Sequence, residues 1–571
     1  MEQHDCREPI ETIVAVLTPR KRKFYAIAGT IYLICSLGTS LWYINILQPS
    51  FANDLWWPNY NVTGHQAFLI DLVNQYLTTH SSGNLDLLGS SSIIQKTYSS
   101  IEPTTNIYSP YIHNIILGKL VAIEYAVTQV RQLSTYWCMR VNVQHCWVDF
   151  NKTFEMAHTA IRQQRCINHY KDNAAVYMEA ILRNQPWQQY LKTWGGNGLR
   201  FNVAIQRALE ESQQGRDFLA EMSISYNATS VTQEFTYWKR YNFTYFQLQW
   251  QNRWQPGITE TIVVENALGM QQQYSLKMLN QVSGPWTSQH LFWMPLNDLF
   301  NAMILNRSFV RSGSRYFGTN NNGLKIIDLE AYHGVVGMNN SMFNLPSVFH
   351  NTIGPFVSVD SWNLPPLQSL VNAVNQFTNL LFDQIRQSPL LWQSFTEIPD
   401  TIIYPMPSQW QNKTYYGGDI TCTAGSPTNY IQDQYNFSND CAHRVPFGIS
   451  LTKPKVLFAL ASRNSNAPAY MPCRLQSSSM CSNIINKATA LANNLVFPTD
   501  STMSIASDIQ NLNISIIQYT SQPWQLLQQN LLTKSDEDWN FFGWGLLYDW
   551  ARGIREVISF EGDISSIVAI S

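Results

Sequence analysis

Two residues with metal-binding potential, Glu155 and His158, form a Glu-x-x-His pair. On a helix, positions three apart project to one side, and di-iron carboxylate bundles use this spacing. Such a site needs the motif twice and two more glutamates from other helices. The sequence contains one copy, so the ligand set of a di-iron site is incomplete.

Three further residues near this motif, His145, Asp149 and His169, have side chains that can ligate a metal and could complete a different site. The alternative is a capped helix that begins near Asn151, with His158 hydrogen-bonded in a core beside a disulfide. We favour this alternative and expect no metal and no cofactor.

Paired carboxylates of the glycosidase kind are the next candidates, because two such groups must face each other across a sugar. Asp536, Glu537 and Asp538 precede an aromatic residue, but we expect them to begin a helix or to lie in a solvated turn. Asp360 and Glu397 have no supporting motif. The sequence contains no nucleophile elbow, phosphate loop, HExxH motif or dinucleotide fingerprint, and whether the protein is an enzyme stays open.

Seven of the nine cysteines fall into two groups after residue 130. In an oxidising compartment most of them would form disulfides, and zinc is the less favoured alternative because close CxxC-type pairs are missing. In the first group, Cys146 with Cys166 is the preferred local bridge, which leaves Cys138 free or paired at long range. The second group allows three connectivities, and its members are Cys422, Cys441, Cys473 and Cys481.

A membrane-spanning helix is the strongest prediction from the sequence. No charged residue occurs between Lys23 and Asp54, and about 20 apolar residues cross a hydrocarbon core. Four basic residues, 20–23, precede the segment, and no Lys or Arg follows until Lys96. This asymmetry predicts a cytoplasmic tail (1–23) and a single-pass helix that contacts the lipid bilayer (24–47). A cleaved signal peptide is the alternative, although its apolar stretch is usually shorter.

The composition after this helix is typical of an exported glycoprotein. Charged residues make up 13% of the chain and the formal net charge is −2, so no nucleic-acid partner is expected. Attached glycans can supply the solubility that charges otherwise give. Nine Asn-x-Ser/Thr sequons follow the helix and are the candidate glycosylation sites, although a chain rich in asparagine produces several by chance: Asn61, Asn151, Asn227, Asn242, Asn306, Asn339, Asn412, Asn436 and Asn513.

The pattern of apolar residues predicts an α+β fold with a mainly helical membrane-proximal region (48–222) and a mixed, disulfide-containing region (223–571). The clearest helix is 115–133, where apolar residues recur at steps of three and four. Other predicted helices span 65–80, 154–166, 173–183, 201–222, 367–385, 484–495 and 524–532. Strands are predicted at 223–226, 236–250 and 260–265 from local alternation and from their Tyr, Phe, Thr, Val and Trp content. Residues 401–481 are expected to be rich in loops, and 541–558 is too charged for a lipid-facing span.

Several short segments resemble a family of large, uncharacterised oomycete membrane proteins. The resemblance lies in residues 146–150 (Cys-Trp-Val-Asp-Phe), 155–159, 165–166, 175–177, 182–184, 249–252, 353–356 (Ile-Gly-Pro-Phe) and 559–563 (Ser-Phe-Glu-Gly-Asp). It implies an N-terminal span, a glycosylated ectodomain and further spans downstream, so this chain would be a shortened member. It implies no activity and no catalytic residue.

The sequence therefore predicts a membrane-anchored extracytoplasmic glycoprotein with a binding or scaffold role toward a protein or glycan partner. Low charge, aromatic content and the missing catalytic set favour this function. One alternative is an extracytoplasmic enzyme acting on polysaccharide. The other is the lumenal part of a multi-span transporter or scaffold. Ligand, oligomeric state and final compartment stay open.

Overall fold

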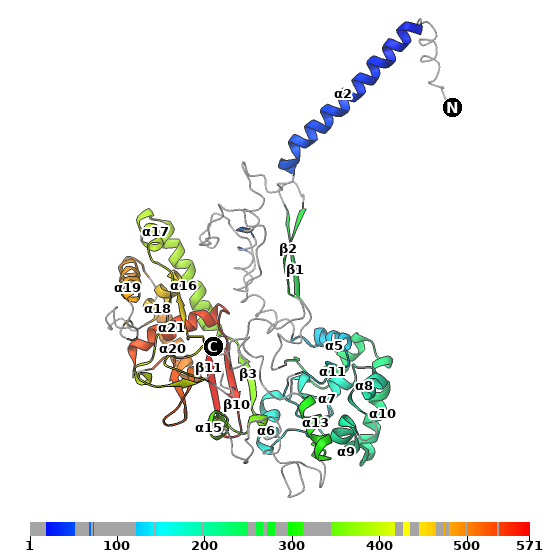
Figure 1. Ribbon diagram of the computed structural model, residues 1–571, viewed down its shortest axis with the longest axis vertical. Helices are drawn as coiled ribbons and strands as arrows, with labels where there is room; N and C mark the ends of the chain where they lie inside the picture. The colour runs from blue at the N-terminus through cyan, green and yellow to red at the C-terminus, as the bar shows by residue number, and fades with distance from the viewer. Residues whose placement is uncertain are drawn as a thin grey trace. The chain divides into compact units, whose positions relative to one another are not determined.

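The computed structural model describes residues 19–51, 121–141, 143–195, 199–248, 258–265, 271–279, 295–311, 344–416, 426–433, 445–463, 479–496, 500–533 and 536–570, with a few isolated residues. The chain divides into two units. The described part of the first unit consists chiefly of helix α2 (Pro19–Phe51) and the antiparallel strands β1 (Ile258–Glu265) and β2 (Gln271–Leu279). The second unit contains the other elements (Figure 1).

Helix α2 contains the predicted span, and its stretch Pro19–Leu47 is long and apolar enough to cross a membrane. None of the side chains in its apolar window is buried, whereas the core helix of a soluble protein is mostly buried. Two of its hydroxyl groups bond within the helix, because the Thr30 hydroxyl donates to the Ala26 carbonyl and the Thr39 hydroxyl to the Cys35 carbonyl. Such bonds let hydroxyl groups lie on a lipid-facing helix.

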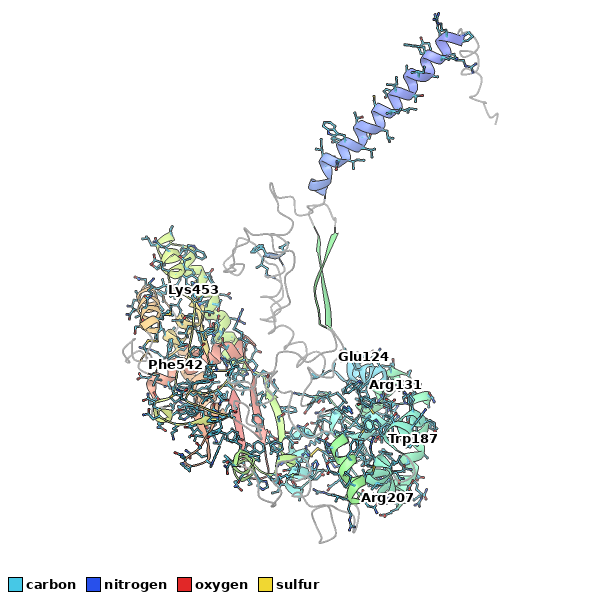
Figure 2. All side chains as sticks on the ribbon, in the orientation of Figure 1. Glu124, Arg131, Trp187, Arg207, Lys453 and Phe542 are labelled. Atoms are coloured by element: carbon cyan, nitrogen blue, oxygen red, sulfur yellow. A yellow bond between two sulfur atoms is a disulfide. The ribbon has the colours of Figure 1, made fainter. Side chains whose placement is uncertain are left out.

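The N-terminal half of the second unit is helical. Its elements are α5 (Ile123–Gln132), α6 (Ala160–Arg165), α7 (Met178–Leu182), α8 (Trp187–Trp194), α9 (Arg207–Glu210), α10 (Gln213–Ala228), α11 (Val231–Arg240) and α13 (Pro295–Leu305), with π-helical turns η3 (Cys166–Tyr170) and η5 (Asn202–Gln206) and a 3-10 turn η4 (Ala174–Val176). They enclose a buried apolar cluster, here called the first core, contributed by residues 123–310 and Val357. Figure 2 labels Trp187 of α8, which packs against this core, and Arg207 of α9.

The C-terminal half combines helices with a seven-stranded sheet. The helices are α15 (Asn344–Thr352), α16 (Gln368–Arg386), α17 (Pro389–Thr396), α18 (Lys453–Ser462), α19 (Ser479–Ala492), α20 (Asp500–Leu512) and α21 (Glu537–Ala551), with 3-10 turns η8 (Phe356–Ser358) and η9 (Ser408–Trp410). The sheet strands are β3 (Asp360–Leu364), β5 (Tyr415–Tyr416), β6 (Pro427–Thr428), β8 (Ser515–Thr520), β9 (Gln525–Asn530), β10 (Val557–Glu561) and β11 (Ser566–Ile570), and β4 (Thr401–Ile403) pairs separately with β7 (Ile449–Leu451).

The sheet has the order β3-β10-β11-β8-β5-β6, with β9 on the other side of β8, and β3, β10 and β11 lie side by side in Figure 1. Alternate residues point to opposite faces. Val557 and Ile570 therefore join the second core, an apolar cluster with helices α16 to α21, whereas Ile558 and Phe560 join a smaller cluster with α15 on the opposite face. Figure 2 labels Phe542 in the second core.

The mixed fold of helices and sheet agrees with the predicted α+β class. Helix α16 matches the predicted helix 367–385, and strand β1 contains the predicted strand 260–265. The described part of the predicted helix 115–133 contains α5. The predicted helix 65–80 lies almost entirely outside the described residues.

Several predicted elements are wrong. Residues 223–226 belong to α10 and residues 236–240 to α11, so aromatic and β-branched content there did not indicate strands. Packing of one face against the first core overrides that weak preference. The predicted helix 524–532 is strand β9, which pairs with β8 along its whole length.

Candidate functional site

The candidate site is a buried cluster of His145, His158 and Asp298 in the second unit. Each of the three side chains is 1% exposed. His158 Nε2 lies 3.0 Å from Asp298 Oδ1 and 2.9 Å from Oδ2, and His145 Nε2 also contacts Oδ2. Two imidazoles from neighbouring segments thus meet one carboxylate supplied about 140 residues later in the chain.

Local backbone features hold the two histidines in place. The Asp149 carboxylate accepts hydrogen bonds from the backbone N–H groups of Thr153 and Phe154, which closes the loop between the histidines. Thr159 is the N-cap of α6, and its hydroxyl accepts from the Arg162 N–H at 3.0 Å. This cap places His158 directly before the helix.

Glu155 and His158 do not share a helix, since the expected helix start near Asn151 is wrong and α6 begins at Ala160. Glu155 forms an isolated bridge with Trp147 and pairs with Arg311 at 3.4 Å, away from the Asp298 contact. The expectation that His158 is hydrogen-bonded in a core is confirmed.

A buried arginine, Arg162, continues the cluster toward the sheet. Its Nη1 contacts His158 Nδ1, and its Nε and Nη2 donate to Asp360 Oδ1 at 3.0 and 2.6 Å. Arg162 is 1% exposed and Asp360 is fully buried. A buried ion pair of this kind requires close geometry to offset the loss of hydration of both charges.

The Asp360 carboxylate, which Arg162 contacts, would destabilise the sheet if it had no cation beside it. Asp360 on β3 lies directly opposite Glu561 on β10, and like charges opposite each other destabilise a strand pair. Arg162 and Arg165 neutralise Asp360, while the Tyr170 hydroxyl donates to Glu561 at 2.5 Å. The cations and the phenol come from α6 and η3, so this helix compensates the two strands.

Hydrogen-bond donors and acceptors specify the proton positions in the cluster. His158 Nδ1 faces the Arg162 guanidinium, which can only donate, so this nitrogen accepts and Nε2 carries the proton donated to Asp298. His145 Nδ1 lies 3.2 Å from the Val143 carbonyl, which can only accept, so Nδ1 carries a proton. His145 Nε2 faces a carboxylate oxygen. That contact is favourable only if a second proton or a metal ion lies between the two atoms.

Electrostatics agrees with this proton pattern for two of the groups. Burial lowers the pKa of His158 to about 4, an effect that the nearby Asp298 carboxylate opposes only in part. His158 is therefore neutral near pH 7. Although burial alone would raise it, the pKa of Asp298 is held well below its usual range by the two histidines, so Asp298 is a carboxylate.

The cluster fits a metal ion only in part. The three ligand atoms lie within 4.8 Å of one another, and His145 has the usual arrangement of a metal ligand, with its second nitrogen donating to a backbone carbonyl. His158 does not, because a metal on Nε2 would leave a proton on Nδ1 facing the Arg162 donor. The contacts therefore favour a hydrogen-bonded His–Asp–His cluster over a metal centre.

The remaining residues considered as ligands lie elsewhere. Asp149 closes the loop described above, and His169 is exposed and lies 3.2 Å from Glu561. Asp298 and Arg162 complete the cluster and were missed by sequence reasoning. The only signal for Asp298 was an acidic residue in the first turn of an apolar helix, where it can be a simple capping charge.

Three of the carboxylates considered for sugar hydrolysis form other contacts in the fold. Asp360 is neutralised by arginine. Asp536 is the N-cap of α21 and accepts from the Trp539 N–H at 3.1 Å, which confirms the expectation that this acidic run begins a helix. Glu397 is at the C-terminal end of α17, where its carboxylate accepts from Gln393.

Two cysteine pairs lie at disulfide distance, Cys146 with Cys166 and Cys473 with Cys481. The first is the pair that the sequence favoured, and it connects the segment of His145 to the C-terminal end of α6. Cys138 is buried without a disulfide partner among the described residues, and burial raises the pKa of its thiol. Cys422 and Cys441 lie outside the described residues.

The nine sequon asparagines also divide into residues that the structure describes and residues that it does not. Asn151, Asn227, Asn242, Asn306, Asn412 and Asn513 are described, and all six are exposed. The other three lie outside the described residues: Asn61, Asn339 and Asn436.

Comparisons of this chain with protein-family models, with curated proteins and with solved structures found no match. In the structure, residues 353–356 and 559–563 lie together. The Ile564 N–H donates to the Ile353 carbonyl at 2.9 Å, and a Cβ on Gly562 would lie 2.0 Å from that carbonyl oxygen. Gly562 is thus required by a close backbone approach.

Proposed function

We propose that the protein is a single-pass membrane glycoprotein with a cytoplasmic N-terminal tail, whose large second unit lies on the extracytoplasmic side and binds a protein or glycan partner. The observation that carries the proposal is helix α2, an exposed apolar helix of membrane-spanning length. Basic residues 20–23 precede it, and the next Lys or Arg is Lys96. This charge asymmetry favours a cytoplasmic tail.

Two features of the second unit support an extracytoplasmic location. Its two cysteine pairs at disulfide distance suit an oxidising compartment. All six described sequon asparagines are exposed, as glycan attachment requires. Membership in the oomycete membrane-protein family is part of the same proposal.

A binding role is supported by an exposed aromatic group after α5. Tyr136 is 49% and Trp137 is 37% exposed, and the Arg140 guanidinium lies 4.3 Å from the centre of the Tyr136 ring. Exposed aromatic residues beside arginine are typical of recognition surfaces for proteins and sugars. The buried His–Asp–His cluster, by contrast, lacks the solvent exposure that a substrate would need, which makes a catalytic role for it less favoured.

The test is a topology measurement on the full chain, expressed in eukaryotic cells with a tag at Met1. We expect a downward gel shift on glycosidase treatment with the tag retained, and protease added to intact vesicles should remove the tag and spare the second unit. An unshifted band, or a tag protected from protease, would contradict the proposed topology. Glycan-array binding compared between the wild type and Trp137→Ala then tests the recognition surface.

A further inference from the structure

The six described non-glycine residues with positive φ are not scattered at random along the sequence. They are Lys152, Asn242, Asn306, Asn412, Asn513 and Gln522. Five of the six lie inside an Asn-x-Ser/Thr sequon, and every asparagine in the set is a sequon asparagine. Five of the six described sequons therefore coincide with turns where the chain adopts a left-handed backbone, and the sixth, at Asn227, lies in α10.

Asparagine alone explains only part of this coincidence. It tolerates the left-handed region better than other L-residues, so it is expected at such turns. A Ser or Thr two positions later is not required by the turn, and only about one residue in seven of this chain is Ser or Thr. The hydroxyl residue therefore needs its own explanation at each of the four asparagine turns.

For two of the turns the fold supplies that explanation. Ser308 is buried and donates to the Ala204 carbonyl at 2.7 Å. Ser515 is buried and contacts Asn530 Oδ1 at 3.0 Å. These two serines have structural roles, so the sequons of Asn306 and Asn513 can be by-products of packing.

For the turns at Asn242 and Asn412, the fold supplies no explanation of the hydroxyl residue. Thr244 and Thr414 are exposed, and the structure describes no hydrogen bond of either hydroxyl group to the residues that it places. The residues beside them, Phe243 and Tyr415, point inward and are 3% and 0% exposed. The asparagine and the threonine of each sequon thus face solvent from one short segment. Both threonines lie outside the strands, so the preference of threonine for strands does not explain them either.

We infer that Asn242 and Asn412 carry N-linked glycans, an inference that rests on the proposed extracytoplasmic location. Their φ values are 63° and 60°, and both asparagines are exposed. Asn242 follows helix α11 and Asn412 follows the η9 turn, so each glycan would leave the protein at the end of an element rather than from a packed face. In the attachment reaction the Asn Nδ2 forms a bond to the anomeric carbon of a lipid-pyrophosphate-linked oligosaccharide. The lipid pyrophosphate leaves, and the amide loses one proton.

The test is site mapping on the wild-type full chain from eukaryotic cells, so that no variant has to fold. Amidase release of glycans in heavy-oxygen water converts each occupied asparagine into mass-labelled aspartate. We expect the label at Asn242 and Asn412. Label only at other sequons would overturn this inference and leave the proposed topology standing. No label at any of the nine would overturn both.

Matched variants test the same sites by gel mobility. Asn242→Asp and Asn412→Asp should each remove one glycan, and Thr244→Val should do the same while keeping a β-branched side chain at the exposed position. Thr244→Ser keeps the sequon and should migrate like the wild type. A Thr244→Val protein that keeps wild-type mobility would overturn the assignment of Asn242.

Discussion

The first and second cores of this protein differ in how they treat charge. The first core buries several charged groups and completes their pairing, as in the contacts of Arg162 with Asp360 and of Arg183 with Glu234 at 2.7 Å. The second core is mainly aliphatic and aromatic, and its main buried pair is Lys455 with Asp549 at 2.6 Å. Burying apolar surface stabilises without directional demands, whereas a buried ion pair stabilises only in one geometry. The first core should therefore be the more sensitive to single charge changes.

The largest effect is expected for Asp360→Asn. The substitution keeps the shape of the side chain but leaves the buried Arg162 without its anion, and breaking such a pair costs about 3–5 kcal/mol. Some relief of repulsion with Glu561 will lower this cost. Denaturant unfolding of the detergent-solubilised full chain, followed by tryptophan fluorescence, measures the change.

Asp400→Asn is the matched control, because Asp400 also pairs with a cation, Lys453 at 3.1 Å, but is 52% exposed. Exposed pairs contribute under about 1 kcal/mol. If both substitutions changed the free energy of unfolding equally, burial would not be what distinguishes the first core.

The next largest effect is a loss of folding stability as the pH is lowered. Because burial lowers the pKa of His158 to about 4, the unfolded chain binds a proton on this imidazole below about pH 6.5 while the folded chain does not. The unfolded state therefore gains stability first as the pH falls. The folded state should lose about 3 kcal/mol between about pH 6.5 and 4 from this group. The lowered pKa of Asp298 acts in the same direction at lower pH.

Unfolding measured at several pH values in the wild type and in His158→Gln isolates this contribution. The glutamine can still donate to Asp298 but does not titrate, so the decline between pH 6.5 and 4 should become shallower. His169→Gln removes an exposed histidine and should leave the decline intact. Parallel curves for the wild type and His158→Gln would contradict a buried neutral imidazole.

The parts of the fold and of the candidate site that the sequence could predict are those set by local spacing. The short separation of Cys146 and Cys166 favoured the pair that the structure places at disulfide distance, and the periodicity of residues 367–385 predicted α16. Asp298 and Asp360 meet His158 and Arg162 across 140 and 198 residues, and no periodicity carries that information. The strands predicted at 223–226 and 236–250 failed because residue preference was weaker than the packing of α10 and α11.

A smaller effect is expected at the buried pair of the second core. Lys455→Met removes the closest cation of Asp549, but the Arg555 guanidinium is 3.6 Å away and can take over part of the pairing. We expect a loss of about 2 kcal/mol, below the usual cost of breaking an isolated buried pair.

The double variant Lys455→Met/Asp549→Leu should recover most of that loss, since an apolar replacement of a buried pair is often neutral. The corresponding double variant in the first core, Arg162→Met/Asp360→Leu, should stay destabilised, because Arg162 also contacts His158 and Val357. Equal recovery in both cores would show that their charges are equally replaceable.

The smallest expected effect is that of metal. Zinc bound to His145, His158 and Asp298 at 100 times its dissociation constant would stabilise the fold by about 2.7 kcal/mol. We expect no such gain, and no loss on adding EDTA, because the Arg162 guanidinium faces the His158 nitrogen that a metal ligand would keep protonated. The measurement is the unfolding midpoint of the full chain with excess zinc and then with EDTA, beside the metal content of the purified protein. A zinc-dependent midpoint that disappears in His145→Gln would instead place a metal between His145 and Asp298.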